Sequence, residues 1–133
     1  MRFVMLLPAP PEILESIGSR PDKALVSAMR KYDAEMRKAG VLILAEGLHP
    51  TSKGVRIKVS GGKRVITDGP FTETKEVIAG FWLIQVKSRE EAVEWANRCP
   101  LPEHGLLELR QIFENSDFPP ELHKSARAEN NNL

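Results

Sequence analysis

A chain of 133 residues and 14.9 kDa is long enough for one compact domain with an ordinary hydrophobic core. Its 19 basic and 18 acidic residues give a formal charge of +1, so no broad positive field exists to gather nucleic acid or an anionic membrane. The single cysteine, Cys99, excludes an intramolecular disulfide, and no apolar run approaches the roughly 20 residues that span a bilayer, so we expect a soluble, cytoplasmic protein.

The first third of the chain predicts a strand, a surface segment and a helix. Residues 2–7 form a continuous apolar run, which is typical of a strand in the middle of a sheet. Residues 8–21 are rich in proline and indicate a surface excursion with room for one or two helical turns. Residues 22–38 carry apolar side chains at helical spacing, and Gly40 follows a basic last turn, which together predict a helix that ends there.

The middle of the chain predicts two neighbouring strands and a hairpin. Residues 41–48 indicate a buried strand. Residues 55–59 alternate apolar and basic side chains, which favours a half-exposed strand adjacent to the first. Residues 60–63, Ser-Gly-Gly-Lys, supply the turn of a hairpin, so residues 64–67 should run back along the second strand.

The last part of the chain predicts a strand, a capped helix and a final strand. Residues 77–86 are apolar enough for a strand, and residues 106–113 alternate imperfectly as the last one. Ser88 between them is placed to cap a helix, with Glu91 as its capping-box partner. Three residues should form the buried side of this helix: Ala92, Val93 and Ala96.

The order of these elements predicts the fold class. Strand, helix, strand, inserted hairpin, strand, helix, strand is the order of an α+β, ferredoxin-like βαββαβ domain, which we assign to residues 1–114. Residues 115–133 have two prolines, three successive asparagines and little periodicity, so we expect a mobile C-terminal tail.

Two helices can cover one face of such a sheet, and the chain has no element left for the other face. A second copy packed sheet to sheet is the natural cover, so we expect a homodimer.

Several segments together resemble the YCII-related proteins of the DGPF type, in order and spacing, over about residues 1–118: AGVL at 39–42, EGLHP at 46–50, DGPFTETKE at 68–76, GFW at 80–82, SREEA at 88–92, Trp95, and ELR at 108–110. The resemblance implies a dimeric α+β barrel of ferredoxin-like protomers. It implies no settled activity; many such proteins of bacteria are encoded beside extracytoplasmic-function sigma factors. A related branch includes a dehydrochlorinase of aromatic degradation with a His and Asp pair, which is not carried over to residues of this chain.

The DGPF segment has a structural and a chemical interpretation. In the first, Asp68 accepts backbone N–H groups as an Asx turn, Gly69 takes an unusual dihedral angle before Pro70, and Phe71 fills the core. In the second, the Asp68 carboxylate lies at a strand end beside a pocket roofed by Phe71, where it acts as a general acid or base. The residues alone leave both open.

His49, at the end of a predicted strand, is the best candidate partner for Asp68, because an imidazole and a carboxylate can transfer protons near neutral pH. The alternative is that its ring binds a backbone carbonyl and only ends the strand. Five further residues are candidates for substrate binding: Pro70, Phe71, Glu73, Lys75 and Trp82.

Each of these candidates also has a structural interpretation. Glu73 and Lys75 suit a solvated ion-pair cluster with Glu76. Phe81 and Trp82 are successive strand residues, so one should face the helices as core and the other the dimer cavity. Tyr32 is expected to bury its ring and keep its hydroxyl at the rim.

Motifs for other chemistries fail on inspection. His104 and His123 lie in a loop and in the tail, and nothing in their spacing brings them to His49 as a metal site. The Ser-Gly-Gly-Lys-Arg run at 60–64 lacks the spacing of a phosphate loop. We therefore expect neither a metal nor another cofactor.

Two functions from different classes remain. One is a small-molecule-binding protein or cofactor-independent enzyme that uses Asp68 and His49. The other is a non-catalytic dimeric module for protein–protein interaction, which the resemblance links to sigma-factor regulation. An enclosed pocket that holds the Asp68 carboxylate favours the first, and a filled interior with an exposed apolar patch favours the second.

Overall fold

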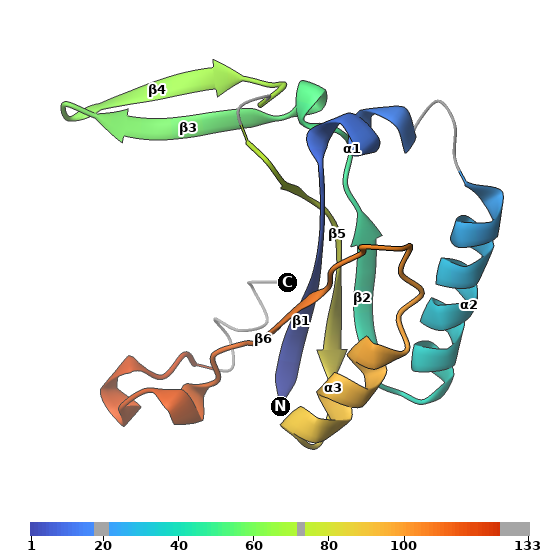
Figure 1. Cartoon of the computed structure of the whole chain (residues 1–133). Coiled ribbons are helices and arrows are strands. Elements are labelled where there is room, and N and C mark those ends of the chain that lie inside the picture. The colour runs from blue at the N-terminus through green and yellow to red at the C-terminus, as the bar shows by residue number, and fades with distance from the viewer. Residues whose placement is uncertain (18–21, 72–73, 126–133) are drawn as a thin grey trace.

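The computed structural model describes residues 1–17, 22–71 and 74–125, and its centre is a four-stranded antiparallel sheet (Figure 1). The strand order is β2-β5-β1-β6, and β3 and β4 form a separate two-stranded sheet. The strands are β1 (Arg2–Ala9), β2 (Leu42–Gly47), β3 (Val55–Ser60), β4 (Lys63–Asp68), β5 (Val77–Gln85) and β6 (Glu108–Gln111). The helices are α1 (Pro11–Ile17), α2 (Lys23–Lys38) and α3 (Arg89–Asn97), and the 3₁₀ turns are η1 (Thr51–Lys53), η2 (Asn115–Asp117) and η3 (Pro120–Leu122).

This arrangement confirms the α+β class, the antiparallel sheet and the inserted hairpin. Helix α2 connects β1 to β2, and α3 connects β5 to β6. Each pair of connected strands is separated in the sheet by one antiparallel strand, as in the ferredoxin-like plan.

The first two helices follow from local sequence signals. Pro11 is the first residue of α1, where its missing N–H costs nothing, so the expected helical turns form there. The Asp22 side chain accepts a hydrogen bond of 3.1 Å from the Leu25 N–H and caps α2. Gly40 has a φ of 75° directly after the last turn, so the helix ends where the sequence predicted.

The third helix departs from the prediction in two details. Ser88 Oγ accepts the Glu91 N–H at 3.1 Å as expected, but the Glu91 carboxylate accepts the N–H of Lys87 at 3.0 Å instead of closing a capping box on Ser88. Val93 is 43% exposed and was wrongly predicted to be buried. Because each helical residue turns the chain by about 100°, the inward side continues instead from Ala92 to Trp95 and then to Cys99.

The hydrophobic core lies between one face of the sheet and helices α2 and α3. Met5, Met36 and Ile84 are its largest fully buried side chains. The Tyr32 hydroxyl was expected at the rim but is buried, and it donates a 2.6 Å hydrogen bond to the carbonyl of Trp95. Burial raises the pKa of this hydroxyl far above its ordinary value.

Residues 41–48 were wrongly predicted as a buried strand next to residues 55–59. Strand β2 lies at the edge of the sheet and pairs with β5, and its Ile43 and Leu44 are 50% and 39% exposed. Strand β3 pairs with β4 in the separate sheet, because the turn η1 carries the chain away from β2. An apolar run has the same pattern in an edge strand and in a central one, so the sequence alone does not separate them.

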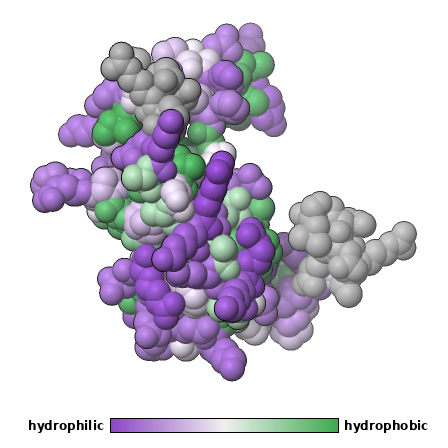
Figure 2. All heavy atoms as spheres, turned by 90° about the vertical axis from the view of Figure 1, so that its right-hand side faces the viewer, coloured by the Kyte–Doolittle hydropathy of each residue, from purple (hydrophilic) through white to green (hydrophobic). Residues whose placement is uncertain are grey.

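The second face of the sheet is apolar and open. Val4 pairs with Leu83 and Leu6 pairs with Phe81, and all four side chains are half-buried on the side opposite Trp82 and Ile84. Within the described residues no helix covers this face, and Figure 1 shows the hairpin extending on the same side of the sheet, away from α2. Figure 2 shows that the α2 side of the molecule is mainly hydrophilic. None of the described helices is long and apolar enough to cross a membrane.

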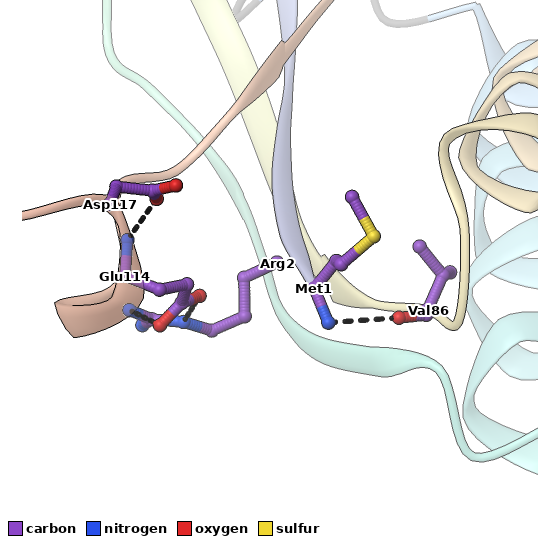
Figure 3. Close-up of polar contacts among 5 residues, drawn as sticks. All are labelled: Met1, Arg2, Val86, Glu114 and Asp117. Carbon is purple, nitrogen blue, oxygen red and sulfur yellow. Dashed lines mark hydrogen bonds and ion pairs between the residues drawn. The ribbon is translucent and has the colours of Figure 1, made fainter.

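The start of β1 forms polar contacts with two later segments of the chain (Figure 3). The N-terminal ammonium of Met1 donates to the carbonyl of Val86 at 3.0 Å, and Arg2 forms an ion pair with Glu114 at 2.8 Å. Asp117 in turn accepts the backbone N–H of Glu114 at 2.7 Å. The predicted tail thus begins with the turns η2 and η3, and residues 126–133 of it lie outside the described residues.

Candidate functional site

A pocket of about 600 Å³ lies where the ends of β1 and β5 meet the turn η1 and the base of the hairpin. Part of its wall comes from the EGLHP segment and part from the segment that begins with Asp68, which are separated in the sequence by the hairpin. The lining residues are Pro8, Leu48, His49, Pro50, Thr51, Lys53, Gly54, Val55, Arg56, Phe71, Glu76, Val77 and Ile78.

The turn η1 holds the two segments together. The N–H of Gly69 donates to the Gly54 carbonyl at 2.9 Å, and the N–H of Phe71 donates to Thr51 Oγ1 at 3.2 Å. On the other side of the turn, the Glu15 carboxylate accepts the Ser52 N–H at 3.3 Å and its hydroxyl at 3.2 Å. Helix α1 therefore holds the turn η1 in place, and η1 in turn holds the segment that begins with Asp68.

Gly69 is required by a close approach and not by a left-handed φ. Its φ lies outside the left-handed region. A Cβ at this position would overlap the carbonyl oxygen of Thr51 and lie 2.6 Å from its carbonyl carbon. The bond to Pro70 is cis. Only glycine lets the loop backbone pass this close to η1.

Phe71 forms part of the pocket wall. The structural interpretation of the segment, in which Phe71 fills the core, was wrong on this point. The Phe71 ring is half-buried, and the Arg56 guanidinium lies over it at 3.9 Å from the centroid. Arg56 also donates to Thr74 Oγ1 at 3.2 Å. These contacts orient the guanidinium at the edge of the pocket.

The two predicted catalytic residues differ in their relation to the pocket. His49 is exposed and lines the pocket, whereas Asp68 is exposed at the end of β4 and does not line it. Within the described residues, no hydrogen bond or ion pair joins His49 to Asp68, and none engages the Asp68 carboxylate as the Asx turn requires. The His–Asp pair therefore stays a prediction.

The other predicted binding residues are scattered. Phe71 lines the pocket, Pro70 and Lys75 are exposed away from its lining, and Glu73 lies outside the described residues. Trp82 belongs to the core, where its indole N–H donates to Asp33 Oδ1 at 2.7 Å.

Trp82 also packs edge-on against Tyr32, with ring centroids 5.9 Å apart. Phe81 faces the open side of the sheet, so the prediction that these two neighbours lie on opposite faces is confirmed, and a dimer cavity at Phe81 stays a prediction.

The cationic residues of the pocket were not predicted from the sequence. Lys53 and Arg56 line it together with His49, and Glu76 is the acidic residue of the lining. Arg56 had been placed on the exposed side of a strand, and its stacking on Phe71 depends on a contact between distant segments. Lys53 belongs to the turn after Pro50, which gives no local sign of a pocket. The described residues contain no group of three or more His, Cys, Asp or Glu side chains placed to hold a metal ion.

The sequence matches the family model of the YCII-related domain over residues 1–116. It is also similar to the uncharacterized protein R00369 of Rhizobium meliloti (strain 1021), with 41% identity over 89 residues that cover 63% of this chain and 72% of that protein. The family match contains every residue that lines the pocket.

Proposed function

The chain belongs to the YCII-related domain family, and from this membership we propose that it is a homodimeric small-molecule-binding protein with its site in the pocket at His49. The observation that carries the proposal is the convergence of the two long motifs of the sequence on one pocket. Leu48, His49 and Pro50 come from the first motif, and Phe71 and Glu76 from the second.

The lining indicates the chemistry of the ligand. Phe71, Val77 and Ile78 offer an apolar wall for a flat or aliphatic body. Lys53 and Arg56 offer cationic groups for a carboxylate or a phenolate. A small organic acid with an apolar body fits both, and His49 supplies an imidazole that can accept or donate a proton at the bound molecule.

The open apolar face of the sheet supports the dimer. Val4, Leu6, Phe81 and Leu83 form a continuous apolar surface across the two central strands. Two such faces packed together bury side chains from both sheets in a layer about 10 Å thick, as sheet-on-sheet packing generally does. This is the packing of the dimeric α+β barrel that the family resemblance implies.

The test is a thermal-shift screen of small carboxylic acids, phenols and quinones on four proteins: the wild type, His49→Ala, Asp68→Asn and the control Lys58→Ala. Lys58 lies on β3 but does not line the pocket. We expect a compound that raises the unfolding midpoint of the wild type, the Lys58 control and Asp68→Asn, but not of His49→Ala. A compound that shifts the wild type and His49→Ala equally, or the absence of any shift, would contradict a site at this pocket.

The exposed hairpin favours a second candidate function, the non-catalytic interaction module. Ile57, Val59 and Ile66 are each more than 60% exposed, and this is the apolar patch that such a module requires. In that case the hairpin binds a different protein, and the pocket has no ligand. Loss of a partner from a cell extract in Ile57→Lys, with no thermal shift for any compound, would favour this candidate.

A further inference from the structure

The hairpin of β3 and β4 has one apolar and one polar face. Directly paired residues of an antiparallel ladder share a face, and the pairs alternate between the two faces. The apolar face consists of the pairs Val55–Asp68, Ile57–Ile66 and Val59–Arg64. The polar face consists of the pairs Arg56–Thr67, Lys58–Val65 and Ser60–Lys63.

The apolar face is bare in the single chain. Val55, Ile57, Val59 and Ile66 expose 54%, 63%, 63% and 68% of their surface. At about 100 Å² each, they amount to roughly 400 Å² in one patch, as large as the largest patch of a typical monomer. A two-stranded hairpin without further packing is only marginally stable in water. The apolar face therefore needs a cover.

The charges at the two ends of this face indicate which partner packs on it. Asp68 lies at the base of β4 and Arg64 near its tip, with Ile66 midway between them. Neither charged side chain forms a hydrogen bond or ion pair within the described residues. Consider a two-fold axis that runs between two facing hairpins, parallel to the line from Ile57 to Ile66. This axis places the base of each hairpin opposite the tip of the other, so each Arg64 lies against the Asp68 of the other copy.

We propose that the apolar faces of two hairpins pack on each other about this axis, with each Ile57 against the partner's Ile57 and each Arg64 against the partner's Asp68. A second copy of this chain presents both an apolar face and the opposite charge at each end of it. A different protein would need to present the same combination. The formal charge of +1 leaves little long-range repulsion between copies. The arrangement goes beyond packing of the open sheet faces, since it joins the two protomers through the hairpins.

The pairing also completes the candidate pocket, and this part of the inference rests on the proposed function. Val55 belongs both to the apolar face and to the pocket wall. In the two-fold arrangement the partner's Val59 covers Val55, and the partner's hairpin turn follows beside it. Leu48 and Ile78 of the pocket wall are 43% and 41% exposed in one chain. Small-molecule sites usually bury 70–90% of the ligand surface, so the second copy supplies a wall that one chain lacks.

Charge exchange between Arg64 and Asp68 tests the hairpin pairing. We expect Arg64→Asp and Asp68→Arg each to raise the dimer dissociation constant about tenfold at low salt, because each puts two like-charged pairs into the dimer. The double variant should return to within a few-fold of the wild type. Lys58→Glu, which makes the same kind of charge reversal on the polar face, should change little. Sedimentation equilibrium measures the dissociation constants of the wild type and these four variants. A double variant no tighter than the weaker single variant would overturn the pairing.

A cross-linking experiment tests the same axis without weakening the dimer. Ile57→Cys should be linked between protomers by a short bis-maleimide, because the two positions face each other across the axis, whereas Lys58→Cys should not. Native Cys99 is buried and gives a low background. Equal cross-linking of both variants, or none of Ile57→Cys, would overturn the proposal.

Hydrogen exchange separates the completed pocket from the pairing. Amides of residues 48–54 should exchange more slowly in the dimer than in diluted wild type or in Arg64→Asp. Unchanged exchange there, together with positive cross-linking, would overturn the completion of the pocket and keep the pairing. Positive cross-linking and slowed exchange with no ligand in the thermal-shift screen would contradict only the small-molecule function.

Discussion

Gly69→Ala should destabilise the protein, because the added methyl group meets backbone and not a flexible side chain. The new Cβ would overlap the Thr51 carbonyl oxygen and lie 2.6 Å from the carbonyl carbon, so η1 and the loop must separate. Two hydrogen bonds depend on their present distance. They run from the Gly69 N–H to the Gly54 carbonyl at 2.9 Å, and from the Phe71 N–H to Thr51 Oγ1 at 3.2 Å.

The size of the effect follows from these contacts. At about 1 kcal/mol for each hydrogen bond, loss of both lowers the free energy of unfolding by about 2 kcal/mol. Overpacking at a rigid contact costs typically 1–3 kcal/mol, which is the same range. Gly54→Ala is the matched control. Its Cβ would lie 3.3 Å from the Thr51 carbonyl oxygen, and its φ of −102° suits alanine, so we expect a change within about 1 kcal/mol.

Urea unfolding followed by far-UV circular dichroism, at one protein concentration for all variants, measures the difference. Gly69→Ala should lower the midpoint by about 1 M or more, and Gly54→Ala by much less. Equal midpoints for the two variants would refute the close approach of the loop to η1.

Three further outcomes are expected. Asp33→Ala leaves the buried indole N–H of Trp82 without its acceptor and should lower the free energy of unfolding by about 1.5–3 kcal/mol in urea titrations, whereas Asp33→Asn keeps an acceptor and should lose less. Burial, and to a lesser extent the negative charge of Asp33, raise the pKa of the Cys99 thiol to about 11. Its reaction with a thiol reagent at pH 7 should therefore be far slower in the native protein than in urea, and equal rates would contradict the burial of Cys99. The hydrogen bond from Arg2 lowers the pKa of Glu114, so this ion pair stabilises above the ordinary glutamate pKa and is lost as pH falls through the lowered value. Glu114→Gln should therefore cost less than about 1 kcal/mol at pH 7, because both groups are more than a third exposed, and progressively less as the pH falls through the lowered pKa. A difference in urea midpoint that does not shrink as the pH is lowered would contradict the ion pair.

The elements that could be predicted from the sequence are those set by local interactions. Asp22 and Gly40 bound α2 through contacts within a few residues, and Ser88 caps α3 in the same way. The hairpin turn follows from Gly61 and Gly62, whose φ values are 57° and 76°. Such signals are complete within a short window of sequence, which is why these boundaries were correct.

The burial of strands and the shape of the pocket depend on distant contacts and could not be predicted in the same way. Residues 41–48 form an edge strand because β5 returns beside them from later in the chain. Gly69 is constrained by Thr51, and Phe71 by Arg56, although most or all of the hairpin separates the partners in the sequence. The sequence therefore identified the important segments, EGLHP and DGPF, but not their geometry or the cations between them.

Binding at the pocket is tested most directly by two-dimensional ¹H–¹⁵N NMR of the labelled protein during titration with the acid that gives the largest thermal shift. We expect concentration-dependent shifts confined to the amides of residues 48–56, 71 and 76–78, which surround the pocket. The same signals should stay unchanged in His49→Ala. Shifts centred instead on α2, or equal shifts in the wild type and His49→Ala, would contradict a small-molecule site where the two motifs converge.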